Sequence, residues 1–345
     1  MKRSLAVLAF VVFLVAGCGG GGGDDGSASG TTTSGSSGSG KKIGLVTDIG
    51  GLNDRGFNHL SYVGLQRAQR ELGIDQRVFQ AHSTQEYVPN LSTFARQKYD
   101  LTIGVGFTEA QAIDTAATNF PNSNFAIVDV DATEEAHKPM NLLGLLFKEQ
   151  ETGYLVGYLA GLEEKRRSGP DVIGSVGGQK QPPVDRFIAG YQAGAKAAAP
   201  GIKLLNAYSE DFSDQAKCKQ VALNQIEQGA GVIFQVAGGC GLGALDAAKQ
   251  KGVWGIGVDA DQSFLGPHIL TSAVKRVDTA VFLAIKSVVD GKFKGGTNMT
   301  FGLKQNGVDI GKISAKVPQE EVKKLTQIRA DIISGKISNI PTEVK

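Results

Sequence analysis

The chain has 345 residues, of which 41% are hydrophobic and 20% are charged, and its formal net charge is +2. These values are ordinary for a soluble globular protein, and the length is sufficient for two core-bearing lobes. The balanced charge, without a dense lysine and arginine cluster in the body of the chain, gives no indication of a nucleic-acid groove. We therefore predict no nucleic-acid partner.

Residues 1–17 have the layout of a secretory signal peptide. Two basic residues precede an apolar run at 5–16, which is too short to span a bilayer as a mature helix. Cys18 follows small residues at the cleavage point, an arrangement that resembles the lipobox of bacterial lipoproteins. On that resemblance Cys18 carries the acyl chains, and the alternative is a plain signal peptide with an incidental cysteine. We expect an extracytoplasmic protein, anchored to the cell membrane by lipid.

The segment after Cys18 has the composition of a tether. Residues 19–40 contain ten glycines, six serines and three threonines, and no aromatic residue. Such a segment cannot bury enough surface to offset its ordering entropy. A glycine and serine coil of this length has an end-to-end distance of roughly 25 Å. We therefore expect residues 18–40 to link the lipid flexibly to a folded body.

From residue 43 onward, short β-rich runs alternate with helical patterns. The first series predicts strands at 43–47, 77–81, 101–105, 125–130 and 141–147, with helices at 55–72, 89–97 and 108–118. The second predicts strands at 172–176, 202–207, 232–236 and 254–258, with helices at 150–166, 184–198, 214–228 and 241–250. The last stretch adds an extended run at 269–275, a helix at 277–290 and polar extended pieces around 300–316.

Strand–helix alternation of this kind predicts an α/β fold with two doubly wound parallel-sheet lobes, because each crossover helix covers one face of a sheet. The two series separate near residue 148. We place residues 41–148 plus about 269–292 in lobe 1, and about 149–268 plus 293–345 in lobe 2. The last stretch returns to both lobes, so the hinge should have several strands.

Two cysteines remain if Cys18 is lipidated, and an oxidising compartment allows them to bridge. The helix predicted at 214–228 packs antiparallel to the strand that follows it, which brings Cys218 near the loop that holds Cys240. A bridge over that loop would contribute about 3 kcal/mol. The alternative is two free buried cysteines.

Ligands of open parallel sheets bind beyond the carboxyl ends of the strands. In this sequence those positions carry aromatic rings, carboxylates, amides and glycines, which suit a small polar ligand with a ring. They are Asp48, Asn53, Asp54, Phe57, Asn58, Gly106, Phe107, Asp129, Asp131, Gly177, Gly178, Tyr208, Ser209, Gly238, Gly239, Asp259, Asp261 and Lys275. Structural alternatives remain open: helix capping for Asn53 or Asp54, core packing for Phe57, and turn formation for Asp129, Asp259 and the glycines.

Signatures of catalysis are lacking in the sequence. The four histidines show no metal-ligand spacing, and neither a nucleophile elbow nor a P-loop occurs. We therefore predict a protein that is not an enzyme and that uses no metal and no cofactor.

Six ordered motifs occur along the chain: NDRGFN at 53–58, FAIVD at 125–129, FIAGYQAG at 187–194, VIFQVAGG at 232–239, GVDADQ at 257–262 and TSAVKR at 271–276. Together they resemble the basic membrane protein family of lipoproteins, the substrate-binding components of ABC importers for purine nucleosides. The likeness covers nearly all of residues 41–310. It implies a type I periplasmic-binding-protein fold with the ligand cleft between the lobes.

The resemblance also implies roles for single residues. Asn53 and Asp129 would read the base edge, Phe57 and Phe187 would stack on the base, Asp259 and Lys275 would hold the ribose hydroxyls, and Gly238 and Gly239 would let backbone amides approach the sugar. Phe187 comes from the resemblance alone. Many relatives carry two acids where this chain has Asn53 and Asp54, so either residue could contact the ligand. Asp131 and Asp261 are alternatives to their neighbours, and Asn58 completes the candidate set.

These roles predict a preference among nucleosides. An ionised aspartate only accepts hydrogen bonds, so Asp129 would favour guanine or hypoxanthine over adenine. Acids facing the sugar would repel a phosphate. We expect a monomeric receptor that presents a purine nucleoside to ABC permease subunits. The alternatives are a sugar or signalling-molecule receptor of the same fold, and a sensor subunit.

Overall fold

A computed structural model describes residues 39–345 of the chain. The predictions for the signal peptide, for Cys18 and for the tether as far as residue 38 therefore lie outside the described residues. Within residues 39–345, no helix is long and apolar enough to cross a membrane.

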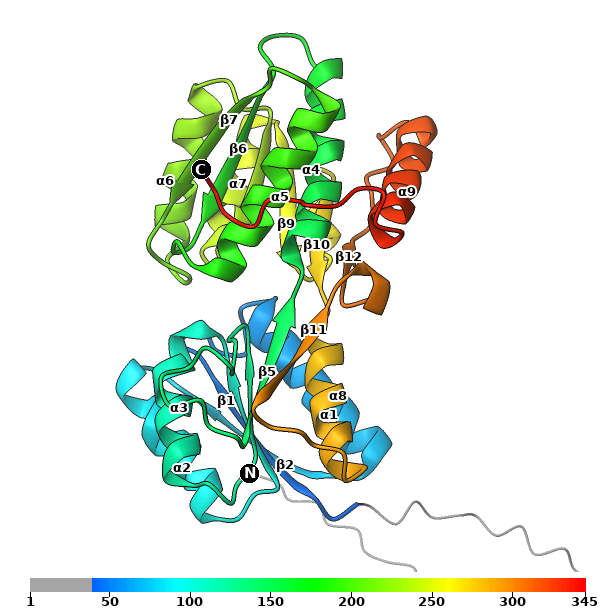
Figure 1. The fold of residues 1–345 in the computed structure, drawn as a ribbon. Coiled ribbons are helices and arrows are strands. Elements are labelled where there is room, and N and C mark those ends of the chain that lie inside the picture. Colours follow the sequence, from blue (N-terminus) through cyan, green and yellow to red (C-terminus); the bar gives the residue numbers. More distant parts are fainter. Residues whose placement is uncertain (1–38) are drawn as a thin grey trace, which may run out of the picture. The chain divides into compact units, whose positions relative to one another are not determined.

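The first sheet has six parallel strands in the order β11-β5-β4-β3-β1-β2. They are β1 (Lys42–Thr47), β2 (Asp75–Gln80), β3 (Leu101–Val105), β4 (Phe125–Val128), β5 (Leu142–Phe147) and β11 (Thr297–Phe301). Helices α1 (Phe57–Leu72) and α8 (Val277–Val289) cover one face, and α2 (Tyr87–Arg96) and α3 (Ala110–Asn119) cover the other (Figure 1). Both faces of this sheet are therefore buried, as its continuous apolar strands require.

The second sheet repeats this order as β12-β10-β9-β8-β6-β7, with β12 antiparallel to β10. Its strands are β6 (Val172–Gly177), β7 (Lys203–Tyr208), β8 (Val232–Val236), β9 (Trp254–Asp259), β10 (Ile269–Lys275) and β12 (Val308–Ile310). Its helices are α4 (Glu149–Arg166), α5 (Pro182–Ala198), α6 (Gln215–Glu227), α7 (Gly241–Lys251) and α9 (Gln319–Ile333).

Helices α4 and α5 pack unusually closely against each other in the second lobe. A Cβ atom on Gly157 would collide with the Tyr191 carbonyl, and one on Gly194 would collide with the Tyr154 carbonyl. Glycine is therefore required at this crossing for reasons of packing. The arrangement fixes α4, whose first residue, Glu149, contacts the buried Lys275 described below.

The chain crosses between the lobes three times, after β5, after β10 and after β11 (Figure 1). Backbone hydrogen bonds join the crossings: Lys148 N–H donates to Phe301 O at 2.9 Å, and Arg276 N–H donates to Gly307 O at 2.8 Å. Two parallel-sheet α/β lobes with this hinge confirm the predicted fold class.

The predicted lobe boundaries were wrong for two strands near the hinge. β10 pairs with β9 and belongs to the second sheet, whereas the prediction placed residues 269–275 in lobe 1. β11 pairs with β5 and belongs to the first sheet, whereas the prediction placed residues 297–301 in lobe 2. An extended run carries no local signal for the sheet that it joins, which explains the exchange. Below, lobe 1 denotes residues 41–147 and 277–301, and lobe 2 denotes residues 149–275 and 303–345.

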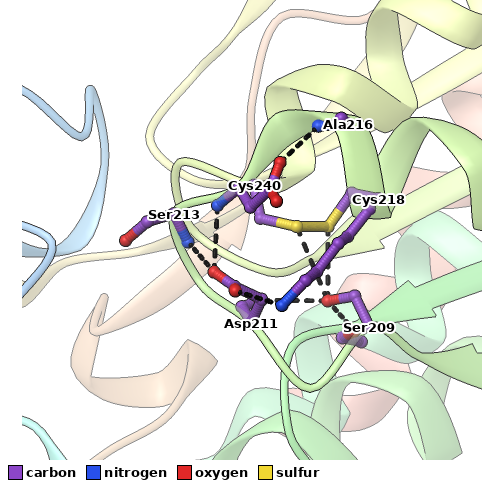
Figure 2. Close-up of polar contacts among 9 residues, drawn as sticks. Ser209, Asp211, Ser213, Ala216, Cys218 and Cys240 are labelled. Atoms are coloured by element: carbon purple, nitrogen blue, oxygen red, sulfur yellow. Dashed lines mark hydrogen bonds and ion pairs between the residues drawn. A yellow bond between two sulfur atoms is a disulfide. The ribbon is translucent and has the colours of Figure 1, made fainter.

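A disulfide joins Cys218, in the first turn of α6, to Cys240, which directly precedes α7 (Figure 2). Their Cα atoms are 5.6 Å apart, and both side chains are fully buried. The structure thus contains the predicted pair rather than two free thiols.

Candidate functional site

A pocket lies between the lobes, at the carboxyl ends of both sheets. Its walls combine aromatic rings, carboxylates, one lysine and backbone at glycine. They are formed by Asp48, Gly50, Asp54, Phe57, Asn58, Gly106, Phe107, Asp129, Pro183, Val184, Phe187, Phe212, Val236, Gly238, Gly239, Val258, Asp259 and Lys275.

Asp48 follows β1 and is held at the pocket wall by two donors. Asn58 Nδ2 lies 2.6 Å from Asp48 Oδ1, and the Gly50 amide donates to the same oxygen at 2.9 Å. The other oxygen, Oδ2, accepts no hydrogen bond from residues 39–345. Burial raises the pKa of Asp48 to about 6, against the lowering effect of the Asn58 hydrogen bond. Asp48 therefore offers the pocket an acceptor whose direction is fixed.

Asp54 caps helix α1. Its Oδ1 accepts from the amides of Gly56 and His59 at 3.0 and 3.1 Å, and its Oδ2 accepts from the Asn58 amide at 2.7 Å. These amides are among the unpaired donors that begin a helix, so the capping alternative raised for this position holds for Asp54. Asp54 lines the pocket as well, but its hydrogen-bonding capacity is largely used. Asn53 is exposed and lies outside the pocket walls.

Four phenylalanine rings reach the pocket. Phe57 opens α1 in lobe 1 and is half-buried, whereas Phe187, on α5 in lobe 2, is only 3% exposed and packs edge-on against Phe234. Phe212 lies in the loop between β7 and α6 and is also half-buried. Its ring meets Phe107 of lobe 1 edge-on, with centroids 5.8 Å apart. Phe107 and Phe212 therefore bring the two lobes into contact at the cleft.

Lys275, the last residue of β10, is the centre of a buried charge cluster. Its Nζ lies 2.6 Å from the Asp129 carboxylate and 2.9 Å from Glu149 Oε1, and the residue is 1% exposed. Glu149 Oε2 in turn lies 2.7 Å from Arg186 Nε. Burial acts to lower the pKa of Lys275, but Asp129, Glu149 and Asp259 together raise it. Lys275 is therefore a cation in spite of its burial.

Asp129 and Asp259 follow or end equivalent strands, β4 and β9, and both adopt left-handed backbone with φ of 69° and 62°. This conformation is uncommon outside glycine and clusters at functional sites. Burial raises the pKa of Asp259 to about 7, and Lys275 opposes the rise. Asp259 accepts no hydrogen bond from the described residues and lines the pocket. It is a buried acid that lacks a protein partner.

The structure brings most of the candidate set together at the pocket: Asp54, Phe57, Asn58, Asp129, Phe187, Gly238, Gly239, Asp259 and Lys275. Asn53 and Asp261 are exposed and lie elsewhere. Asp261 accepts from the Ser263 amide at 3.1 Å in a local turn. Asp131 accepts from the Thr133 amide at 2.9 Å and from Asn298 Nδ2 at 2.6 Å, so it joins its own turn to β11.

Sequence reasoning did not single out Phe212, Glu149 or Arg186. Phe212 lies four residues beyond a strand end, and its loop has no pattern that would mark it. Glu149 is the first residue of the helix after the first crossing, where an acid also suits the helix dipole. A search for acidic residues where the chain crosses between the lobes, as possible partners of Lys275, could have found Glu149. Asp48 and Phe107 were noted at strand ends but were given no role.

Comparisons with known proteins agree on the family. The model of the family described as ABC transporter substrate-binding protein PnrA-like matches residues 41–343. The ABC transporter nucleoside-binding protein BmpA of Lactococcus lactis subsp. cremoris is 36% identical, covering 98% of each chain. An uncharacterized lipoprotein of Pyrococcus horikoshii is 34% identical, covering 99% of this chain and 89% of that one.

Among solved structures, a solute-binding protein of an ABC transporter system from Aeropyrum pernix is similar with a TM-score of 0.78 and 26% identity. The match covers 87% of this chain and 94% of the other. The function of this family is to bind a substrate rather than to transform it. With the two-lobed fold and the cleft between the lobes, these matches show that the chain belongs to the PnrA-like family of ABC transporter substrate-binding proteins.

Proposed function

We propose that this protein binds a purine nucleoside in the cleft and delivers it to the transmembrane permease subunits of an ABC importer. The observation that carries the proposal is a pocket that combines aromatic walls with an acidic acceptor from each lobe and a buried lysine. Asp48 of lobe 1 offers a fixed acceptor, and lobe 2 offers Asp259, which accepts no hydrogen bond from the described residues and lies near the cation Lys275. A nucleoside has the matching layout, since a flat base carries a polar edge and is joined to a sugar with vicinal hydroxyls.

The base lies against Phe57 in this proposal. A purine stacked on one aromatic ring gains roughly 1–3 kcal/mol. From lobe 2, Phe212 is the better candidate for the other face, because Phe187 is almost fully buried and can only close the floor. The resemblance implied that Phe57 and Phe187 stack on the base; this proposal keeps Phe57 and assigns the second face to Phe212 instead of Phe187.

The base edge is read by Asp48 in this proposal, although the sequence pointed to Asn53 and Asp129. Asn53 lies outside the pocket, and the Asp129 carboxylate is paired with Lys275. Asp48 has one oxygen free and its other oxygen fixed by Asn58. An ionised carboxylate only accepts hydrogen bonds, so this site favours the N–H donors of guanine and hypoxanthine over the edge of adenine.

The ribose lies at the lobe 2 end of the pocket. Asp259 accepts from a vicinal hydroxyl pair, and Lys275 donates to the same sugar while it offsets the charge of the acid. The amides of Gly238 and Gly239 donate no backbone hydrogen bond within residues 39–345 and line the pocket. They are therefore available to a sugar oxygen. The pocket walls contain four aspartates and one lysine, so a phosphate on the ribose is repelled.

The cellular setting completes the proposal. The signal peptide and lipobox resemblance predict an extracytoplasmic lipoprotein anchored through Cys18, and one relative is named a lipoprotein. The ligand contacts both lobes and so favours the closed state that a permease would recognise. The protein acts as a monomer.

Isothermal titration of the purified protein against guanosine, inosine, adenosine, guanosine monophosphate and ribose tests the proposal. We expect guanosine and inosine to bind at least about tenfold more tightly than adenosine, which corresponds to about 1.4 kcal/mol. Ribose and the nucleotide should not bind. Adenosine binding more tightly than both other nucleosides would refute the base-edge assignment. Tight binding of free pentoses, without nucleoside binding, would instead support a sugar receptor.

A further inference from the structure

We propose that the Cys218–Cys240 disulfide positions the wall of the cleft formed by Phe212, Gly238 and Gly239, so that ligand affinity depends on the bridge. The identity of the ligand rests on the proposed function. The positioning role rests on how two loops of lobe 2 are joined.

The first link is made by the backbone of the two loops. Cys240 directly follows Gly239, and its amide donates to the Phe212 carbonyl at 2.9 Å. Cβ atoms built on Gly238 and on Gly239 would each lie 3.4 Å from that same carbonyl oxygen. The loop that carries Phe212 therefore rests directly on the two glycines, and all three residues line the pocket.

The second link is the bridge itself, which contacts Ser209 at the start of the loop of residues 209–214 (Figure 2). Ser209 Oγ lies 3.4 Å from Cys218 Sγ and 3.5 Å from Cys240 Sγ, and it donates to the Asp211 carbonyl at 2.9 Å. The bridge thus connects the start of α6, the start of α7 and the base of the loop. Because both cysteines are fully buried, they act as a fixed floor for this loop.

The loop has further contacts besides the bridge. At its start, the amides of Ser209 and Glu210 donate to the carbonyls of Gly177 and Gly178 at 2.8 Å each, and the Phe212 ring packs over Gly178. Asp211 Oδ1 accepts from the amides of Ser213 and Asp214 at 2.8 and 2.9 Å, and Oδ2 lies 2.8 Å from Lys217 Nζ (Figure 2). None of these contacts connects the loop to Gly238 and Gly239. Opening the bridge therefore leaves one backbone hydrogen bond among the described residues, from the Cys240 amide to the Phe212 carbonyl, to join the two loops.

If the bridge holds this wall of the cleft in its bound position before the ligand arrives, the entropic cost of ordering the wall on binding is lower. When the bridge opens, Phe212 gains freedom and the ligand must order it. The expected consequence is a faster dissociation and a Kd that rises by about tenfold. A bridge that only stabilised the fold would lower the melting temperature and leave the Kd unchanged.

The test compares the oxidised protein, the protein reduced by a dithiol, and the C218S/C240S double variant. Reduction converts the bridge into two thiols while the dithiol closes into its own disulfide. The Kd for inosine is measured at a temperature well below the melting temperature of every form. We expect the reduced protein and the double variant to bind about tenfold more weakly than the oxidised protein. An unchanged Kd would overturn the proposal.

A pair of matched variants separates positioning from a general loosening of the protein. In Phe212→Leu, reduction should change the Kd by no more than about twofold, because the side chain held by the bridge is already altered. In Phe57→Leu, on the opposite lobe, reduction should still change it by about tenfold. Equal effects of reduction in the two variants would overturn the proposal.

Hydrogen exchange of the ligand-free protein gives a readout that does not depend on the nucleoside. On reduction, the amides of residues 211–215 and 238–241 should exchange faster, while those of residues 106–109 on lobe 1 should not. Unchanged exchange in the first two segments would overturn the positioning role. If no nucleoside binds the oxidised protein, the proposed function fails, and the exchange result decides the positioning role by itself.

Discussion

The two lobes share one topology but differ in the chemistry at their strand ends. Asp129 follows β4 and Asp259 ends β9, which occupy the same place in their sheets, and both residues have left-handed backbone. Asp129 is nevertheless paired with Lys275, whereas Asp259 accepts no hydrogen bond from the described residues. Although they lie at equivalent positions, Asp129 is therefore the counterion of Lys275 in lobe 1, whereas Asp259 is a free hydrogen-bond acceptor in lobe 2.

The first strands of the lobes show the same divergence. After β1, lobe 1 carries Asp48, which Asn58 holds in place. After β6, lobe 2 carries Gly178, where a Cβ atom would collide with the ring of Phe212. Lobe 1 therefore supplies a polar reader at this end of the cleft and lobe 2 supplies an apolar cover. The comparison shows that topology sets where a side chain lies, while its neighbours set what it can do.

The largest effect should follow from removing Lys275, a buried cation that pairs with acids of both lobes. Lys275→Met leaves Asp129 without its buried partner and Glu149 with Arg186 alone, and breaking a buried pair costs about 3–5 kcal/mol. We expect the free energy of unfolding in urea to fall by this amount and nucleoside binding to be lost. Lys286→Met, which removes an exposed lysine paired with Asp290, is the control and should change neither. Wild-type stability in Lys275→Met would show that the cluster is not held by this charge.

Asp259, the acid of lobe 2 that accepts no hydrogen bond from the described residues, should make the free energy of unfolding depend on pH, and the sign of that dependence can be predicted. Because the pKa of Asp259 is raised to about 7 in the folded protein, the native state binds its proton over a range where the unfolded state has lost it. Stability from this group is therefore present at low pH and is lost as pH rises through about 7. Relative to Asp259→Asn, the wild type should lose about 2–3 kcal/mol between about pH 5 and pH 8.

Asp131→Asn provides the matched control for the pH experiment, measured by urea unfolding at both pH values. Desolvation acts to raise the pKa of Asp131, but hydrogen bonds from Thr133 and Asn298 lower it, so this acid is ionised in both states across the same range. The stability gap between wild type and Asp131→Asn should therefore stay constant. A constant gap for Asp259→Asn as well would contradict the burial of an unpaired carboxyl group.

Phe57, the aromatic residue at the lobe 1 wall of the cleft, should contribute to nucleoside affinity by stacking on the base. Phe57→Ala should weaken nucleoside binding by roughly 1–3 kcal/mol, or about tenfold to a hundredfold in Kd. Phe293→Ala, which alters a lobe 1 ring outside the cleft, should leave the Kd unchanged. Titration calorimetry of both variants decides the matter. Equal affinities of Phe57→Ala and wild type would place the base elsewhere.

The smallest expected effect is one of selectivity. Asp48→Asn exchanges a pure acceptor for a group that both donates and accepts, so the preference for inosine over adenosine should shrink by about tenfold. Asp261→Asn, at an exposed acid outside the cleft, should keep the wild-type ratio. The ratio of the two Kd values is the measurement. Should Asp48→Asn retain the full preference, another group must read the base.

The candidate residues were predictable because ligands of open parallel sheets bind beyond the carboxyl ends of the strands. That rule selects Asp48, Asp129, Asp259 and Lys275 as strand-end positions, whereas the cleft between the lobes was implied by the family resemblance. The rule does not determine side-chain direction: Asn53 is one residue from Asp54 and yet is exposed.

Features that depend on contacts distant in sequence were not predictable in this way. β10 and β11 were each assigned to the wrong lobe, because the sequence of an extended run does not reveal which sheet the strand joins. Glu149 and Arg186 come from different helices, and only the packing of α4 on α5 places their charges together behind Lys275. Phe212 reaches the cleft because its loop rests on Gly238 and Gly239, which no local pattern indicates.

A crystal structure with inosine bound tests the central claim most directly. The account predicts the hypoxanthine ring against Phe57 with its N–H edge at Asp48, and the ribose hydroxyls at Asp259 and Lys275. A nucleoside bound away from these residues would contradict the account. So would a cleft that accepts only a carbohydrate without ring nitrogens.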